Sequence, residues 1–187
     1  MKRYFLIGLG ALLLTSGSFT TELPVSASLI PGTEVAQNTQ AKRQVQLNLT
    51  AAKKVVEQSS DGKQQVSWQS LQGNVTVQPG DVIRYTVTGA NNESRPASNL
   101  VVTQPIPKQT AYVLNSSATI KSTATVSYSI DNGKTFVAKP TVQVKLANGK
   151  FETRPAPAEV YTHVRWKFAN EIAAKSTVAA AYQVRVK

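Results

Sequence analysis

The stretch Pro79-Gly80-Asp81-Val82-Ile83-Arg84-Tyr85-Thr86-Val87-Thr88 decides the fold class of this chain. It opens with turn residues, among which Gly80 tolerates a positive φ angle. Beyond the turn, Ile83, Tyr85 and Val87 alternate with polar residues. This alternation is typical of a strand that buries one face. The stretch therefore predicts a tight turn followed by a half-buried β-strand.

The same alternation recurs along the chain and predicts further strands. These lie around Val45–Leu49, Val126–Ile130, Val142–Leu146, Val160–Phe168 and Val178–Val186. Turn residues separate the runs, at Ser60-Asp61-Gly62, Asp131-Asn132-Gly133 and Asn148-Gly149. The last of these turns predicts a hairpin, because Asn-Gly between two apolar runs favours a tight reversal. Helix is expected only within Glu171–Lys175, and there for at most one turn.

Two proline pairs and the number of strands define the expected architecture. Pro105-Ile106-Pro107 and Pro155-Ala156-Pro157 cannot lie within central strands, because proline lacks the N–H of a ladder hydrogen bond. They predict crossings between sheets or breaks at an edge. Seven or more short strands with regular turns predict an all-β fold. We expect an immunoglobulin-like antiparallel β-sandwich of Greek-key topology, with a barrel as the alternative.

Aromatic residues supply the expected core. Five of them fall on apolar registers and are core candidates: Trp68, Trp166, Tyr85, Tyr128 and Tyr182. Tyr161 and Tyr112 are the aromatic residues expected nearest the surface.

The N-terminal segment predicts export. Lys2 and Arg3 precede the apolar run Tyr4–Leu14, and small residues end at Ala27. This is the layout of a secretory signal peptide, and the apolar run is shorter than the roughly 20 residues that span a bilayer. We expect a signal peptide over residues 1–27, with cleavage after Ala36 as the alternative, then a disordered leader over 28–43 and one domain over 44–187. No membrane span is expected after cleavage.

Composition restricts the chemistry and the partners. The chain has no cysteine, which excludes disulfides, a thiol nucleophile and cysteine metal sites. Its formal charge is +11, and it falls to +10 when Lys2, Arg3 and Glu22 leave with the signal peptide. Such a charge attracts polyanions. Because the chain is expected to be periplasmic, at the cell surface or secreted, acidic polysaccharide or another envelope component is a better partner than nucleic acid.

Three pieces of sequence carry a family resemblance. They are Val77–Thr88 with Asn91, then Asn99–Pro107, then Tyr128–Phe136 with the late Val164-Arg165-Trp166. In this order they resemble the conserved repeat domain of bacterial and archaeal surface proteins known as domain of unknown function eleven. The resemblance covers Gln44 to Lys187 in a single copy. It implies an immunoglobulin-like sandwich without catalytic residues. Gln104 stands where that family usually has Asp.

Candidate catalytic residues are few. His163 is the only histidine, so it cannot form a histidine-rich metal site. As the base of a serine hydrolase it would need an orienting aspartate, yet every candidate adjoins a turn glycine or asparagine, namely Asp61, Asp81 and Asp131. No Gly-x-Ser-x-Gly motif is present. We therefore expect a non-enzymatic protein with no cofactor and no metal ion.

Two further acidic arrangements have structural explanations. Glu152 and Glu159 are the acids that could form a glycosidase pair, but they flank a proline-rich break among cations. Asp131-Asn132-Gly133 is followed by Lys134, whose charge would repel calcium. A hairpin turn is the better interpretation of that segment.

A basic sheet face is the sharpest functional hypothesis. It assumes that the strands around Trp166 and Tyr182 pair as a hairpin, with Trp166 near Ala180 and Val164 near Tyr182. The opposite face would then carry Tyr161, His163, Arg165, Lys167, Arg185 and Lys187. Arginines beside a tyrosine suit sulfate, carboxylate or phosphate groups. The alternative is cross-strand support, with Tyr161 stacked on Arg185 and Glu159 paired with Lys187.

Two functions follow as expectations. The first is a non-catalytic exported module with a structural or adhesive role at the cell envelope, where its partner would be an envelope protein. The second is binding of acidic polysaccharide or another polyanion through Tyr161, Arg165, Lys167, Arg185 and Lys187. The oligomeric state is left open by the sequence.

Overall fold

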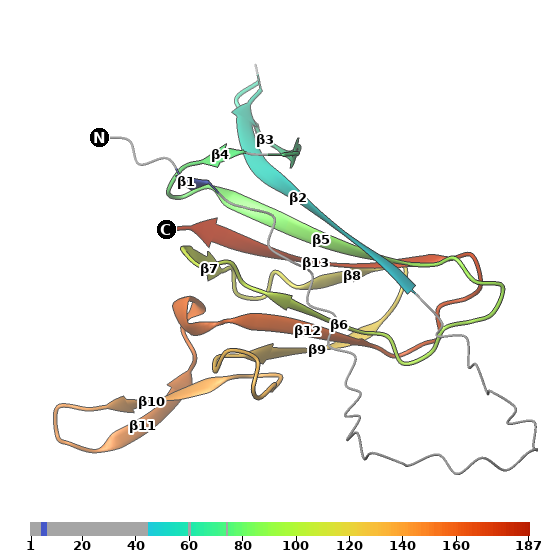
Figure 1. The fold of residues 1–187 in the computed structure, drawn as a ribbon. Coiled ribbons are helices and arrows are strands. Elements are labelled where there is room, and N and C mark those ends of the chain that lie inside the picture. The colour runs from blue at the N-terminus through green and yellow to red at the C-terminus, as the bar shows by residue number, and fades with distance from the viewer. Residues whose placement is uncertain (1–4, 7–44, 60, 74) are drawn as a thin grey trace, which may run out of the picture.

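The computed structural model describes residues 5–6, 45–59, 61–73 and 75–187, and these form strands with one short 3-10 helix (Figure 1). The first strands are β1 (Phe5–Leu6), β2 (Val45–Gln58), β3 (Gln64–Leu71), β4 (Thr76–Val77), β5 (Val82–Asn91), β6 (Val101–Pro105) and β7 (Thr110–Tyr112). They are followed by β8 (Ala118–Ile120), β9 (Ala124–Ser129), β10 (Thr141–Lys145), β11 (Phe151–Pro155), the helix η1 (Ala158–Val160), β12 (His163–Phe168) and β13 (Thr177–Val186). The expected leader and, apart from β1, the expected signal peptide lie outside the described residues.

Two antiparallel sheets form the body of the molecule. The larger sheet has the order β3-β2-β5-β13-β7, and β8 also pairs with β13. The smaller sheet has the order β6-β12-β9. Two further pairs stand outside these sheets, namely β10 with β11 and β1 with β4. The prediction of an all-β chain with antiparallel sheets is confirmed.

The core lies between the two sheets. On β5, Ile83, Tyr85 and Val87 are at most 4% exposed and alternate with half-buried residues, as their sequence pattern predicts. On β12 and β13, Trp166 and Tyr182 are equally buried, and their ring centroids lie 5.9 Å apart. Because these two residues come from different sheets, their contact shows that the sheets pack face to face.

One expected core residue lies elsewhere. Trp68 on β3 is only partly buried and carries the guanidinium of Arg84 4.1 Å above its ring. Arg84 lies between the inward Ile83 and Tyr85, so both it and Trp68 occupy the outer face of the larger sheet. The prediction that Trp68 lies in the core is wrong. β3 is an edge strand, and the alternation of its residues does not show which of its two faces packs against the core.

The turns follow the local sequence closely. Gly149 adopts φ 79°, and Leu146 N–H donates to Lys150 O at 2.8 Å, which closes the predicted β10–β11 hairpin. Pro105 and Pro155 each end a strand, and β6 is an edge strand, as expected for proline.

The expectation of helix was wrong. Within Glu171–Lys175, Ile172 forms a β-bridge with Ala97, and Lys175 has φ 56° in a turn. The helical turn occurs instead at Ala158–Val160, directly after Pro157.

Two buried polar side chains have different surroundings. Asn91 is 1% exposed, and its Nδ2 donates to the carbonyl oxygens of Arg95, Ile172 and Ala173 at 2.8–3.1 Å. Its Oδ1 accepts from Glu93 N–H at 3.1 Å. By contrast, Nε2 of Gln104 is buried with no hydrogen-bond partner in the described part of the chain. Asn91 thus fixes the loop after β5 to the segment before β13.

Candidate functional site

Strand β12 presents its polar residues to the outer face of the smaller sheet. Val164, Trp166 and Phe168 are at most 4% exposed and point into the core. Side chains alternate along a strand, so His163, Arg165 and Lys167 point outward. Lys167 is exposed, whereas His163 and Arg165 are partly covered. The predicted basic residues of this strand therefore share one face.

The segment after β9 folds over that face. Phe136 lies with its ring centroid 3.4 Å from the guanidinium carbon of Arg165, and Arg165 Nε donates to Thr103 Oγ1 at 3.0 Å. The same phenyl ring meets the imidazole of His163 edge-on, with centroids 6.4 Å apart. Arg165 is thus held by an aromatic face and a hydroxyl, which restricts its freedom to bind an external anion.

Asp131 shapes the covering segment. Its two carboxylate oxygens accept hydrogen bonds from the hydroxyls of Ser129 and Thr135, both at 2.6 Å. They also accept from the N–H groups of Lys134 and Thr135 at 3.0–3.1 Å. These donors hold the pKa of Asp131 well below its ordinary value, Ser129 contributing most. The carboxylate therefore fixes a turn, as the sequence predicted.

His163 sits between this turn and Arg165. Its Nδ1 lies 3.2 Å from Thr162 Oγ1. Burial lowers the pKa of His163, Arg165 lowers it further, and Asp131 opposes both. The buried hydroxyl of Ser129 donates to Asp131, not to His163. Ser129, Asp131 and His163 therefore lie in one region of the sheet face. Their hydrogen bonds are not those of a hydrolase triad, because in a triad the histidine accepts a hydrogen bond from the nucleophile.

The expected basic face is divided between two sheets. Strand β12 pairs with β6 and β9, and β13 pairs with β5, β7 and β8. The hairpin assumed between β12 and β13 does not form, and that prediction is wrong. Trp166 meets Tyr182 across the core instead of beside it in one sheet. The outward residues of the two strands therefore face opposite sides of the sandwich.

The remaining predicted residues are thereby separated. Arg185 is exposed on the outer face of the larger sheet, opposite Val82 and Ala111. Lys187 follows β13, is also exposed, and donates its N–H to Gln109 O at 2.9 Å. The structure thus brings Arg165 near His163 and Lys167, and Arg185 near Lys187, but does not unite the two groups.

Tyr161 belongs to an aromatic cluster. Its ring stacks on Tyr112 with centroids 5.2 Å apart and meets Tyr128 at 5.4 Å. Tyr112 is 2% exposed and shares a 3.2 Å hydroxyl contact with Tyr128. The expected surface position of Tyr112 is wrong, and Tyr161 neither stacks on Arg185 nor shares a face with it. Both tyrosines pack where β7 passes the helix η1, a long-range contact that alternation does not reveal.

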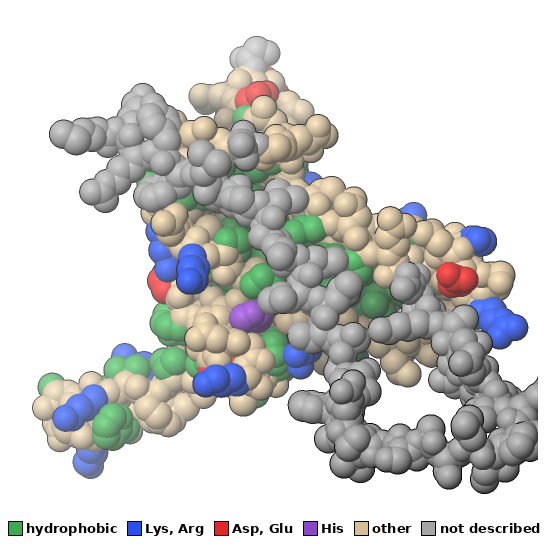
Figure 2. All heavy atoms as spheres, viewed as in Figure 1, with side chains coloured by type: hydrophobic (Ala, Val, Ile, Leu, Met, Phe, Trp, Pro, Cys, Tyr) green, Lys and Arg blue, Asp and Glu red, His purple; other side chains and the backbone are tan. Residues whose placement is uncertain are grey.

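The feature that sequence reasoning missed is a projecting arm formed by β10 and β11. In the described part of the chain these strands pair only with each other, and Figure 1 shows them extending away from both sheets. Phe151 is 69% exposed, the largest value among the exposed large hydrophobic residues. Figure 2 shows hydrophobic side chains mixed with lysines and arginines along this arm. The hairpin signal was visible in the sequence, but its projection was not.

Within the ranges that the structure describes, no helix is long and apolar enough to cross a membrane. No three His, Cys, Asp or Glu side chains within those ranges are grouped so that they could hold a metal ion. In comparisons with known proteins, no family model, curated protein or solved structure matches this chain.

Proposed function

We propose that this protein is an exported, non-catalytic module that has a structural or adhesive role at the cell envelope. Its sandwich would be of immunoglobulin-like, Greek-key type, as the sequence resemblance implies. It would act in the periplasm, at the cell surface or after release. Its contacts would be made by strands and loops, with an envelope protein as the partner.

The observation that carries this proposal is the β10–β11 arm. An isolated pair of strands is only marginally stable in water, and the exposed ring of Phe151 gains no burial from the sandwich. Exposed aromatic residues are enriched in protein interfaces and often supply much of the binding energy. An arm of this kind is suited to contact with another protein.

A capture experiment tests this proposal. The chain lacking residues 1–27 is immobilised and exposed to envelope protein and envelope polysaccharide fractions at low and high salt. We expect one protein to be retained at high salt, because apolar contacts are weakly screened. Phe151→Ser should lose that protein, whereas Ile120→Ser, which removes a half-exposed apolar residue from β8, should retain it. Equal capture by both variants would contradict a role for the arm.

A second candidate function is binding of a polyanion. Four of the 21 basic residues and two of the 10 acidic residues precede Val45, so 17 bases stand with 8 acids in the domain. Only three ion pairs form within the described residues, involving Lys53, Lys63 and Arg154. The excess charge, spread over both outer faces, favours acidic polysaccharide.

The same capture experiment distinguishes this second function. Polysaccharide should bind at low salt and be released at high salt, because screening weakens contacts between exposed charges. Lys167→Glu and Arg185→Glu should each weaken binding independently, since the two residues lie on opposite faces. Capture that both reversals leave unchanged would contradict the polyanion function.

A further inference from the structure

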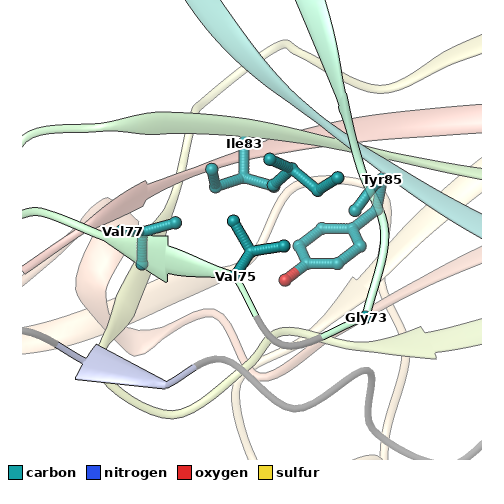
Figure 3. Close-up of a pocket in the computed structure, with 7 residues that line it drawn as sticks. Gly73, Val75, Val77, Ile83 and Tyr85 are labelled. Carbon is teal, nitrogen blue, oxygen red and sulfur yellow. The ribbon is translucent and has the colours of Figure 1, made fainter.

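An apolar recess lies in the larger sheet beside β4 (Figure 3). It is lined by Ala51, Leu71, Gly73, Val75, Val77, Ile83 and Tyr85. The space between these residues measures about 280 Å³ and is continuous with solvent. In Figure 3, Val75, Val77 and Ile83 surround it together with the ring of Tyr85. No charged side chain contributes to the lining.

Strand β4 borders this recess, and the turn that follows β4 in the chain holds it in place. Gln78 N–H donates to Asp81 Oδ2 at 2.8 Å, and Asp81 also pairs with Lys53 at 2.8 Å. Gly80 N–H donates to Val186 O, and Val186 N–H donates to Asp81 O, both at 2.9 Å. The turn after β4 is thereby tied to Lys53 in the middle of β2 and to the end of β13. A strand edge that is fixed in advance loses less conformational entropy when it binds.

The chain itself shows what can pair with this edge. Phe5 and Leu6 form the antiparallel strand β1, in register with Val77 and Thr76 respectively. These two residues belong to the apolar run Tyr4–Leu14 that the sequence assigns to a signal peptide. In the described part of the chain, β4 has no other strand partner. Cleavage of the signal peptide would therefore remove β1 and leave the edge of β4 open.

We propose that β4 and its recess form a strand-docking site for an extended apolar segment of an envelope protein, which takes the place that Phe5–Leu6 occupy in the full-length chain. This inference rests on the proposed export, because cleavage opens the edge. The segment would add antiparallel to Thr76–Val77 and place an apolar side chain in the recess. Addition of a strand to an exposed edge is a general mode of peptide recognition.

The surroundings of the recess define the chemistry of its occupant. Lys53 lies opposite the lining residue Ile83, and its charge is neutralised by Asp81 at 2.8 Å, so this pair offers little attraction to a charged peptide. A charge placed in the apolar lining would lose its hydration without compensation. Two paired residues supply few backbone hydrogen bonds, so most of the affinity must come from the inserted side chain. The site should therefore select extended apolar segments over charged ones.

The test uses the chain that would remain after cleavage. The core residues that the structure describes lie between Val45 and Val186, so removal of residues 1–27 takes none of them away. The probe is a synthetic peptide with the sequence of residues 4–9 and two added lysines for solubility. We expect binding that shifts the backbone amide resonances of Val75, Thr76 and Val77. A peptide with aspartate at the positions of Phe5 and Leu6 should not bind.

Two variants locate the contact. Val75→Asp introduces a charge into the recess and should weaken peptide binding at least about tenfold. Val137→Asp changes an exposed valine that pairs with Tyr128 beside the smaller sheet, and it should leave binding unchanged. Thr76→Pro removes a backbone donor from β4 at an exposed position, and it provides a second variant if Val75→Asp does not fold. If neither variant folds, the resonance shifts of the unmodified protein still locate the peptide-binding site.

Two results would overturn the proposal. The first is absence of peptide binding, or resonance shifts confined to residues outside the recess. The second is self-association of the shortened chain that the peptide blocks, because a second copy would then occupy the site. Failure of the capture experiment with envelope proteins would not change the peptide titration, so this site and the proposed function can fail separately.

Discussion

At the scale of single residues, Asn91 joins two segments that are distant in the sequence. Its amide nitrogen contacts three carbonyl oxygens, two of them 81 and 82 residues further along the chain. Burial of these polar groups is tolerated because each one is paired. Removing the side chain would take these hydrogen bonds away and would also remove the acceptor of the Glu93 N–H. The carbonyl oxygens of Ile172 and Ala173 would keep the N–H groups of Ala97 and Ser176 as donors.

We predict that Asn91→Ala lowers the free energy of unfolding by about 2–4 kcal/mol, because the four hydrogen bonds of one buried side chain are lost together. Urea denaturation followed by tryptophan fluorescence measures this change. Asn92→Ala is the matched control, because Asn92 is exposed and, among the described residues, its side chain donates only to Gln46, at 2.9 Å. It should change stability by less than about 0.5 kcal/mol. Similar losses in both variants would contradict the role given to Asn91.

Asp131 makes the stability of the fold depend on pH in the acidic range. Its pKa in the folded protein lies below the ordinary value of 3.8. A carboxyl group with a lowered pKa stabilises the folded state above its ordinary pKa, and this contribution is lost as the pH falls below that value. We predict that Asp131→Ala lowers the unfolding midpoint at about pH 6, and that the difference from the unmodified chain shrinks towards about pH 2.

Thermal unfolding at a series of pH values measures this prediction. Glu171→Ala, which removes an exposed carboxylate from another loop, controls for the change in net charge. A difference between Asp131→Ala and the unmodified chain that stays constant with pH would show that the carboxylate charge is not responsible.

At the scale of elements, the hydroxyl of Tyr182 is among the groups that link the two sheets. Tyr182 on β13 donates to the carbonyl oxygen of Pro105 at the end of β6, at 2.8 Å. Pro105 ends an edge strand, and its carbonyl is therefore available for a partner from the other sheet. Tyr85 stacks on Tyr182 with centroids 5.4 Å apart, and its hydroxyl makes no hydrogen bond within the described residues.

We predict that Tyr182→Phe lowers the free energy of unfolding by about 1–2 kcal/mol, because a buried hydrogen bond between the sheets is lost. Tyr85→Phe is the matched control and should change it by less than about 0.5 kcal/mol. Chemical denaturation of the two variants side by side measures the difference. If Tyr85→Phe were the more destabilising variant, the stabilisation assigned to the hydrogen bond between Tyr182 and Pro105 would be contradicted.

At the scale of the whole molecule, the sandwich and its arm have separate roles. The ends of the arm are close together, because Ala156 N–H donates to Pro140 O at 2.9 Å. The strands of the arm pair only with each other in the described part of the chain. The core residues lie in the sandwich and in its connecting segments. The arm therefore adds contact surface without adding to the core.

We predict that the arm can be removed without unfolding the protein. Replacement of Thr141–Pro155 by an Asn-Gly turn should leave cooperative unfolding intact, because the connection Pro140–Ala156 is already short. The unfolding midpoint should move by only a few degrees, as expected when little core is disturbed. Loss of cooperative unfolding would show that the arm supports the sandwich. The shortened protein should also fail to capture the envelope protein that Phe151 is proposed to contact.

The sequence by itself determined the class of the fold and the faces of its main strands. Alternation along β5, β12 and β13 identified the inward residues, because the period of a strand is a local property. Asn148-Gly149 placed a hairpin correctly for the same reason, since a tight turn depends on its own two residues. The short strands β7 and β8 were missed, because three residues are too few to show a period.

Only the tertiary structure decided how those strands combine. β12 and β13 each bury one apolar face, and that pattern is the same whether they lie side by side in one sheet or face each other across a core. The choice rests on pairings between distant segments, such as β12 with β6 and β13 with β5. It placed Trp166 against Tyr182 and separated Arg165 from Arg185. A candidate site made from two strands could therefore be located only after their partners were known.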